Sequence, residues 1–158
     1  MKKLFYQAES EHATRHLGKL LAEVLPAGST VALIGTLGAG KTRLVQAVAE
    51  ASGVGPGVVV SPTFVLLQEY HGRRTIYHFD AYRIADDDEF LELGPDEYFE
   101  AGQLVLVEWA DRVKRLLPLE RLELRFEVTG PEGRRIEIRA LGPRYEAVLD
   151  QLHDRLMA

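Results

Sequence analysis

Residues 31–49 constrain the fold of this chain more than any other stretch, because a strand, a glycine-rich loop and a helix are expected there in immediate succession. The run at 31–34 is apolar and partly β-branched, as in a buried parallel strand. After the loop, Leu44, Val45 and Val48 fall at helical spacing. The loop itself has two glycines separated by four residues and followed by Lys and a hydroxyl residue, the Walker A pattern. This context favours a phosphate-binding loop over a glycine-rich turn that only joins a strand to a helix.

Each residue type in the loop suits the binding of a nucleotide. Glycine at 38 and 40 lets the backbone curl so that successive N–H groups point at a phosphate, and the following helix adds its positive end. Lys41 can reach the β- and γ-phosphates, and the Thr42 hydroxyl can ligate Mg²⁺. The residues predicted to bind the phosphates are Gly35, Leu37, Gly38, Ala39, Gly40, Lys41 and Thr42.

Composition bounds the class of protein. A length of 158 residues suggests one domain with a real core, and the absence of cysteine excludes disulfides, thiolate metal sites and cysteine nucleophiles. There is no apolar run long enough to cross a bilayer and no secretion signal, so we expect a cytoplasmic protein without a membrane partner. The net charge of −5 argues against strong non-specific binding to nucleic acid. It does not exclude a local basic patch or a partner protein that binds RNA.

Two carboxylates are expected at the ends of strands. The apolar run at 104–107 predicts a buried parallel strand ending in Glu108, in the form of a Walker B segment. Ligands bind at the carboxyl ends of such strands, and a buried acid should face Mg²⁺ or its waters. Asp80 ends the strand-like run at 75–79 and is a candidate for positioning metal or water. The alternatives are an Arg partner for Glu108, and a helix cap or an ion pair with Arg83 for Asp80.

The remaining pattern completes a single three-layer α/β P-loop NTPase domain over residues 1–158, with a mixed parallel and antiparallel sheet. We expect a short edge strand at 3–7, a helix capped by Ser10, hairpins at 65–79 and 119–141, short acidic helices at 86–93 and 96–100, and a C-terminal amphipathic helix from Pro143. The acidic run at 86–89 is interpreted as a solvated helix start rather than a metal site.

For two segments the sequence leaves two interpretations open, and for a third it indicates no functional role. Ser61 to Phe64 is either a turn or a loop that senses the γ-phosphate. Trp109 packs in the core or shapes the site beside Glu108. His78 is interpreted as a strand residue without a further role.

Taken together, these motifs resemble the TsaE family, the small bacterial P-loop ATPase of the tRNA threonylcarbamoyladenosine pathway. The likeness rests on residues 35–42, 61–64, 77–83, 93–99 and 107–109, which stand in family order at family spacing over nearly the whole chain. The chain departs from the family pattern at Thr36, Arg43 and Ala81, where Asp, a hydroxyl residue and Leu are usual.

The resemblance implies roles for particular residues and for partners. It implies that Thr42 and Glu108 hold Mg²⁺, that Asp80 is needed for hydrolysis, and that Glu11 and Arg134 lie near the nucleotide base. It also implies that the protein works with TsaD and TsaB, which modify the adenosine beside the anticodon, so that tRNA is reached indirectly through the complex.

The function expected from the sequence is therefore Mg²⁺-dependent ATP hydrolysis, with Lys41 neutralising the phosphates. Asp80, alone or with Glu108, orients or deprotonates the attacking water. Nothing obvious supplies an arginine finger, so we expect slow turnover alone and a partner that completes the site. A small-molecule kinase is the first alternative, although no lid insertion is clear. A GTP-dependent switch is the second, but without any asparagine the Asn-Lys-x-Asp guanine motif is missing, which favours adenine.

Overall fold

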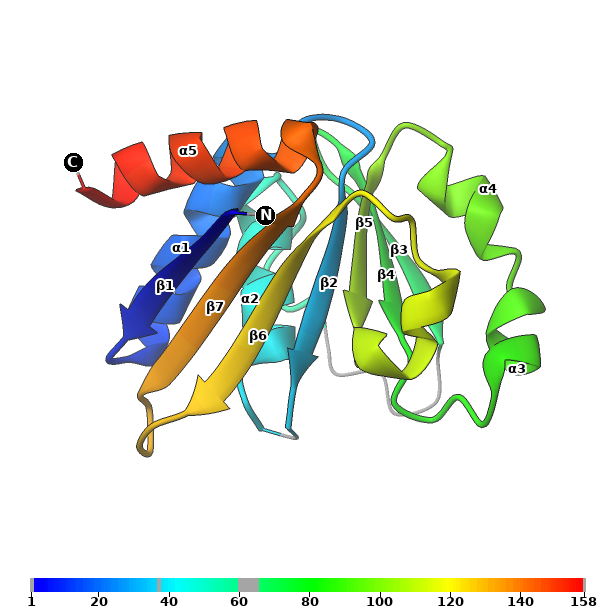
Figure 1. Ribbon diagram of the computed structural model, residues 1–158, viewed down its shortest axis with the longest axis horizontal. Coiled ribbons are helices and arrows are strands. Elements are labelled where there is room, and N and C mark those ends of the chain that lie inside the picture. Colours follow the sequence, from blue (N-terminus) through cyan, green and yellow to red (C-terminus); the bar gives the residue numbers. More distant parts are fainter. Residues whose placement is uncertain (1, 37, 60–65, 158) are drawn as a thin grey trace.

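The computed structural model describes residues 2–36, 38–59 and 66–157 and contains one seven-stranded sheet of order β1-β7-β6-β2-β5-β4-β3 (Figure 1). The strands are β1 (Lys2–Ala8), β2 (Thr30–Gly35), β3 (Leu67–His71), β4 (Thr75–Asp80), β5 (Leu104–Glu108), β6 (Arg121–Val128) and β7 (Arg134–Leu141). The helices are α1 (Glu11–Val24), α2 (Lys41–Ala51), α3 (Asp87–Leu91), α4 (Pro95–Phe99), the 3₁₀ helix η1 (Ala110–Leu116) and α5 (Pro143–Met157).

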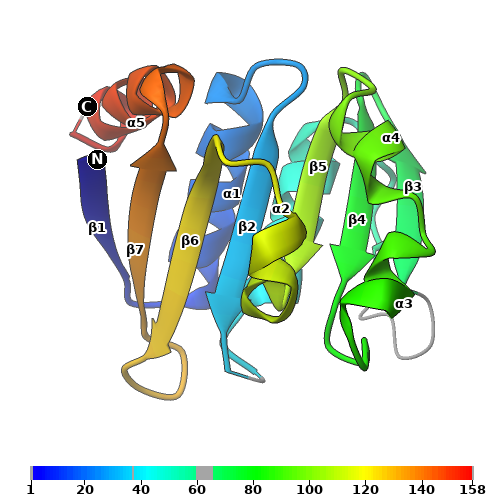
Figure 2. The same ribbon diagram turned by 45° about the vertical axis from the view of Figure 1, so that its right-hand side comes forward.

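The sheet is mixed, which confirms the predicted fold class. β4, β5, β2 and β6 are neighbours that run parallel, while β3, β7 and β1 pair antiparallel at the two sides. The apolar runs expected to be parallel strands occupy the middle of the sheet as β2 and β5. The first strand lies at an edge beside the last one, with Leu4 opposite Ile138. The carboxyl ends of β2, β4 and β5 therefore meet at one edge of the sheet, the lower edge in Figure 2.

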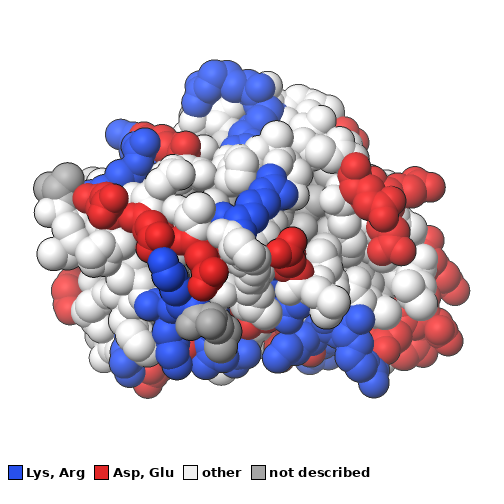
Figure 3. Space-filling model, turned by 45° about the horizontal axis from the view of Figure 1, so that its top comes forward, with Lys and Arg blue, Asp and Glu red and all other residues white. Residues whose placement is uncertain are grey.

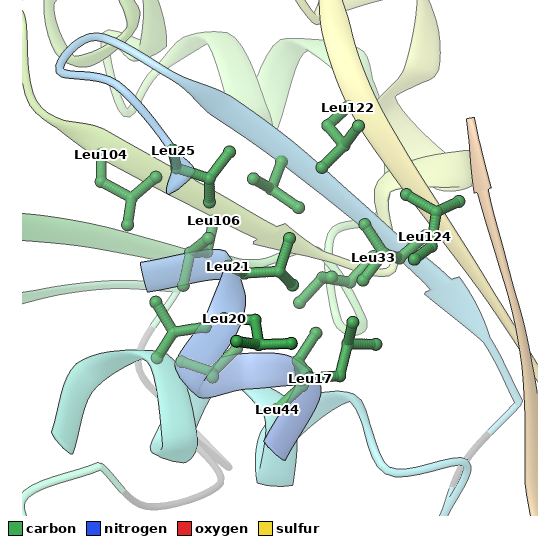
Figure 4. Packing of buried hydrophobic residues seen from close by; sticks show 14 of the residues in the cluster. Leu17, Leu20, Leu21, Leu25, Leu33, Leu44, Leu104, Leu106, Leu122 and Leu124 are labelled. Atoms are coloured by element: carbon green, nitrogen blue, oxygen red, sulfur yellow. The ribbon is translucent and has the colours of Figure 1, made fainter. Parts of the chain in front are cut away.

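Helices cover the sheet on both faces and make three layers. α1, α2 and α5 lie on one face, and α3, α4 and η1 lie on the other (Figure 2). The larger core lies between α1, α2, α5 and the sheet, and leucine is its commonest residue (Figure 4). A smaller core around Phe79 and Phe90 lies beneath α3, α4 and η1. Because side chains alternate along a strand, Leu104 and Leu106 of β5 enter the first core, whereas Val105 and Val107 enter the second.

The expected helices form, with one addition. Ser10 caps α1 by accepting a hydrogen bond from the Ala13 N–H at 3.2 Å. Asp86 caps α3 in the same way, accepting from the Glu89 N–H at 2.9 Å, which agrees with the solvated helix start expected for the acidic run. The sequence analysis assigned no element to residues 110–116, which form η1. The predicted turn or sensor at Ser61 to Phe64 lies outside the described residues.

Helices α1 and α2 approach closely at Gly18, where a Cβ atom would lie 2.6 Å from the Cβ of Ala47. Gly18→Ala should therefore lower the free energy of unfolding by roughly 1–3 kcal/mol through overpacking. The higher helix propensity of alanine should offset up to about 1 kcal/mol of this loss. Urea denaturation measures the change. Lys19→Ala, at the next and exposed position of the same helix, is the control with little expected effect. An unchanged or raised stability of Gly18→Ala would contradict the close packing.

Candidate phosphate- and metal-binding site

The candidate site is formed where strand alternation directs three polar side chains to the α2 face of the sheet. Ile76 at the start of β4 enters the core beneath α2, so His78 and Asp80 on the same strand face the same way. Glu108 follows Leu106 on the same face of β5 and is paired in register with Asp80. All three side chains are at least nine-tenths buried. The strand ends therefore bring together the two carboxylates that the sequence analysis had singled out.

The phosphate loop joins β2 to α2 and has the curled backbone expected from its glycines. Gly38 and Gly40 adopt left-handed conformations with φ of 78° and 101°, which favour glycine over other residues. Gly40 is the N-cap of α2, so the positive end of this helix faces the hollow of the loop. Such an arrangement of N–H groups and helix end is suited to an anion, and above all to phosphate.

Lys41 is the first residue of α2 and is 4% exposed, held between the loop and an indole ring. Its Nζ donates to the carbonyl oxygen of Gly35 and, at 3.2 Å, to that of Thr36. The same Nζ lies 3.6 Å from the ring centroid of Trp109, a cation–π contact. Burial lowers the pKa of the Lys41 ammonium, against the opposing effect of the carboxylates of Glu108, Asp111 and Asp80. Trp109 thus lines the site and also packs against the second core, so both roles considered for it are observed.

Thr42 and Glu108 meet directly behind the loop. The Thr42 hydroxyl donates to Glu108 Oε1 at 2.9 Å and lies 3.2 Å from Oε2. One hydroxyl and one carboxylate are hard oxygen donors, and Mg²⁺ in nucleotide sites usually takes one or two such protein ligands besides phosphate and water. The pair therefore fits Mg²⁺. In the described part of the chain Glu108 contacts Thr42 and His78, an arrangement that favours a carboxylate facing a metal over the alternative of a strand-end ion pair with Arg.

Asp80 is the last residue of β4 and lies beside this pair. Its side chain is hydrogen-bonded to the backbone two residues later in the chain. Its Oδ1 accepts a hydrogen bond from the Tyr82 N–H at 3.0 Å. Burial raises the pKa of the Asp80 carboxyl above its ordinary value, an effect that the Tyr82 hydrogen bond partly offsets. A carboxylate with a raised pKa next to a phosphate loop is a reasonable acceptor for the proton of a water molecule.

His78 makes a contact that the sequence analysis missed. Its Nε2 lies 2.6 Å from Glu108 Oε2, and its Nδ1 lies 2.9 Å from the hydroxyl of Tyr70. Burial, together with the negative charge of Glu108, raises the pKa of Tyr70 to about 12. His78 is a strand residue, as expected, but it also contacts a carboxylate of the site, which was not predicted. The available signal was its position two residues before Asp80, which places both side chains on one face of a strand.

Arg134 and Glu11 lie beside the phosphate loop. Arg134, the first residue of β7, donates to the carbonyl oxygens of Ala39 and Gly38 at 3.0 and 3.2 Å. Because the carbonyl groups of a curled phosphate loop point outward, this guanidinium holds the backbone with its N–H groups inward. Glu11, in the first turn of α1, is ion-paired with Arg43 at 2.9 Å.

These side chains surround an open cavity of about 570 Å³, which is large enough for a nucleotide. Its lining includes most of the residues predicted for the site, namely Glu11, Gly38, Ala39, Gly40, Lys41, Thr42, Asp80, Glu108 and Arg134. Gly35 is absent from the lining and contacts Lys41 through its carbonyl oxygen instead. Leu37 lies outside the described residues. Tyr82 and Trp109, whose ring centroids are 4.8 Å apart with a tilt of 42°, were not predicted to line the same cavity together.

Charge is unevenly distributed over the surface. Figure 3 shows acidic side chains gathered on the side where α3 and α4 lie, and Asp87, Asp88, Asp96 and Glu97 stand in the first turns of these helices. Elsewhere in the same view basic and acidic side chains alternate. None of the helices in the described part of the chain is long and apolar enough to cross a membrane.

Comparison with known proteins gives a consistent result. A family model described as threonylcarbamoyl adenosine biosynthesis protein TsaE matches residues 8–136. The tRNA threonylcarbamoyladenosine biosynthesis protein TsaE of Bacillus subtilis is 38% identical over 159 residues, covering 99% of both chains. The protein of the same name from Treponema pallidum is 35% identical over 131 residues, covering 83% of this chain and 96% of the relative.

A solved structure agrees with these sequence relatives. The crystal structure of Bacillus subtilis YdiB superimposes with a TM-score of 0.82 at 33% sequence identity, covering 98% of this chain and 96% of that one. The family model spans most of the chain, and relatives above 30% identity match along nearly all of it. The chain therefore belongs to the TsaE family of threonylcarbamoyl adenosine biosynthesis proteins.

Proposed function

We propose that this protein is a Mg²⁺-dependent ATPase that acts with TsaD and TsaB in the threonylcarbamoylation of the tRNA adenosine beside the anticodon. The observation that carries the proposal is the meeting of Thr42 and Glu108 at 2.9 Å behind a curled phosphate loop. Thr42 comes from the start of α2 and Glu108 from the end of β5, and both line one cavity together with Gly38 and Gly40 of the loop.

Different residues of the chain bind the phosphates and the metal ion. The N–H groups of the loop and the start of α2 surround the phosphates, and Arg134 keeps the loop in this shape from outside. Lys41 exchanges its contacts with the carbonyl groups of Gly35 and Thr36 for contacts with the β- and γ-phosphates. Thr42 and Glu108 would hold Mg²⁺, which when bound offsets the negative charge that develops on the phosphates.

Water activation is assigned to a carboxylate at the end of β4. Asp80 lies in the same cavity as the loop, and the hydrogen bond from the Tyr82 N–H fixes the orientation of its carboxyl group. Its raised pKa suits a group that orients water or takes a proton from it. No sequence motif supplies an arginine finger, and we expect the intrinsic rate to be low until a partner completes the site.

An affinity pull-down with the tagged chain tests the pathway assignment. We expect TsaD and TsaB to be retained together when ATP and Mg²⁺ are present and to be largely lost when nucleotide is omitted, because the loop contacts change when phosphates are bound. ATP hydrolysis measured on the same mixtures should rise when both partners are added. Equal retention, or none, under the two conditions would remove the main support for a nucleotide-dependent role beside TsaD and TsaB.

A further inference from the structure

His78 is a buried polar residue that the scheme of ATP hydrolysis above does not use. It is 1% exposed, and its side chain lies on the face of the sheet that α2 covers. A buried imidazole has two nitrogen atoms that both need a partner, since an unsatisfied polar atom in the core is costly. Here both partners are other side chains, and one of them is a carboxylate proposed to hold Mg²⁺.

The contact with Glu108 fixes the orientation of its carboxylate. An ionised carboxylate oxygen can only accept hydrogen bonds, so the Nε2–H of His78 is the donor across the 2.6 Å to Oε2. The other oxygen, Oε1, accepts from the Thr42 hydroxyl at 2.9 Å. With one donor on each oxygen, rotation of the carboxyl group about its last bond is restricted, and the edge nearest Thr42 is kept toward the phosphate loop.

The imidazole ring is held in turn by the strand beside it. The Tyr70 hydroxyl lies 2.9 Å from Nδ1, and the two ring centroids are 5.8 Å apart with a tilt of 42°. The same hydroxyl lies beside the side-chain oxygen of Gln68, which is paired with His78 across the β3–β4 hairpin, and its single proton can be donated to only one of these two acceptors. Tyr70 is 3% exposed, so the contacts of His78 with Tyr70 and Glu108 are shielded from water. A continuous series of hydrogen bonds thus runs from the edge hairpin to the metal-binding carboxylate.

We propose that His78, held by Tyr70, is a positioning residue that orients the Glu108 carboxylate for Mg²⁺ in the nucleotide complex. This inference rests on the proposed function, since it assigns to His78 a role toward the metal of that site. Groups that hold metal ligands from behind typically change metal affinity or activity by about 10- to 100-fold when they are replaced. The effect should appear in the binding of Mg²⁺ with nucleotide and not in the binding of nucleotide alone.

Fluorescence of Trp109 provides the readout, because it is the single tryptophan of the chain and its ring lies 3.6 Å from Lys41 Nζ. ATP is titrated in EDTA and then at rising Mg²⁺. His78→Phe fills the space without the donor, and we expect the Mg²⁺ concentration needed for half-maximal tightening to rise by about 10- to 100-fold. Binding in EDTA should stay close to that of the unmodified protein. His78→Gln, which keeps a donor, should restore much of the Mg²⁺ dependence.

Ile76→Val is the control for damage to the core, because it removes a buried methyl group from the same face of the same strand. It should lower the melting temperature without changing the response to Mg²⁺. Should His78→Phe fail to fold, Tyr70→Phe tests the outer link, with Tyr145→Phe as its match because the buried Tyr145 hydroxyl accepts from the Thr30 N–H at the start of β2, the opposite end of that strand from the phosphate loop. Tyr70→Phe should shift the Mg²⁺ response in the same direction by a smaller factor.

Two results separate the possible failures. An unchanged Mg²⁺ response in His78→Phe, or an equal loss of affinity with and without Mg²⁺, would reduce His78 to a packing residue and overturn the inference while leaving the ATPase proposal intact. If the unmodified protein itself binds ATP no more tightly with Mg²⁺ than in EDTA, the proposed function fails first, and the role of His78 toward the metal fails with it.

Discussion

Replacing Lys41 by alanine is expected to reduce ATP hydrolysis by 10²- to 10³-fold or more, on the order of the loss seen when a group that stabilises developing charge is removed. Lys41 is the buried cation of the cavity, and its Nζ is bounded by the loop carbonyl groups and the Trp109 ring. In the nucleotide complex this charge would face the β- and γ-phosphates. A smaller side chain leaves both the phosphates and the loop carbonyl groups without their donor. Steady-state phosphate release measures the effect.

Lys114→Ala is the matched control for this substitution, because it removes an exposed lysine of η1 on the other face of the sheet. Its hydrolysis rate should equal that of the unmodified protein. The melting temperature of Lys41→Ala should also be recorded, since the contacts to Gly35 and Thr36 are lost together. A well-folded Lys41→Ala protein that hydrolyses ATP at the normal rate would refute the assignment of the phosphate site.

Asp80→Asn should lower kcat by about 10²- to 10⁴-fold, the range typical of a general acid or base, while nucleotide affinity changes little. The amide keeps an oxygen that can accept from the Tyr82 N–H, so the local turn at the end of β4 is preserved. What is lost is the ability to take a proton from water. Single-turnover hydrolysis and equilibrium binding of ATP together separate these two effects.

Asp96→Asn, at an exposed position in the first turn of α4, controls for the loss of one negative charge and should hydrolyse ATP normally. The comparison with Glu108→Gln then decides which carboxylate acts on water. Because Glu108 is proposed as a metal ligand, Glu108→Gln should impair Mg²⁺-dependent binding, whereas Asp80→Asn should not. Normal turnover in Asp80→Asn would transfer water activation to Glu108.

Much of this architecture follows from local patterns in the sequence. The apolar runs that end in Asp80 and Glu108 predicted strands whose carboxyl ends carry functional groups, and the register of β4 with β5 places these two residues side by side. The glycines at 38 and 40 predicted the curled loop, and both have the positive φ that such a loop requires. The strand ends and the curled loop depend on neighbouring residues along the chain, which is why sequence alone was enough for them, whereas the register between β4 and β5 is seen only in the structure.

The parts that escaped prediction depend on pairings between distant segments. His78 and Glu108 are thirty residues apart and meet only because β4 and β5 are adjacent strands, which no local spacing reveals. The contact of Arg134 with the loop depends likewise on the placement of β7 near β2 with one strand between them. Trp109 reaches over Lys41 because it has a left-handed backbone with φ of 57°, an uncommon conformation for a residue other than glycine.

The bond between Arg134 and the phosphate loop has a thermodynamic consequence for the antiparallel side of the sheet. A ligand that stabilises the loop should also stabilise β7, because Arg134 of β7 is hydrogen-bonded to the loop. The stabilisation should extend to β1 and β6, which are paired with β7 in the sheet. Amide protons of these strands should consequently exchange with deuterated solvent more slowly in the liganded state, although they lie away from the phosphates. We therefore expect the half of the sheet that carries neither Asp80 nor Glu108 to respond to nucleotide as well.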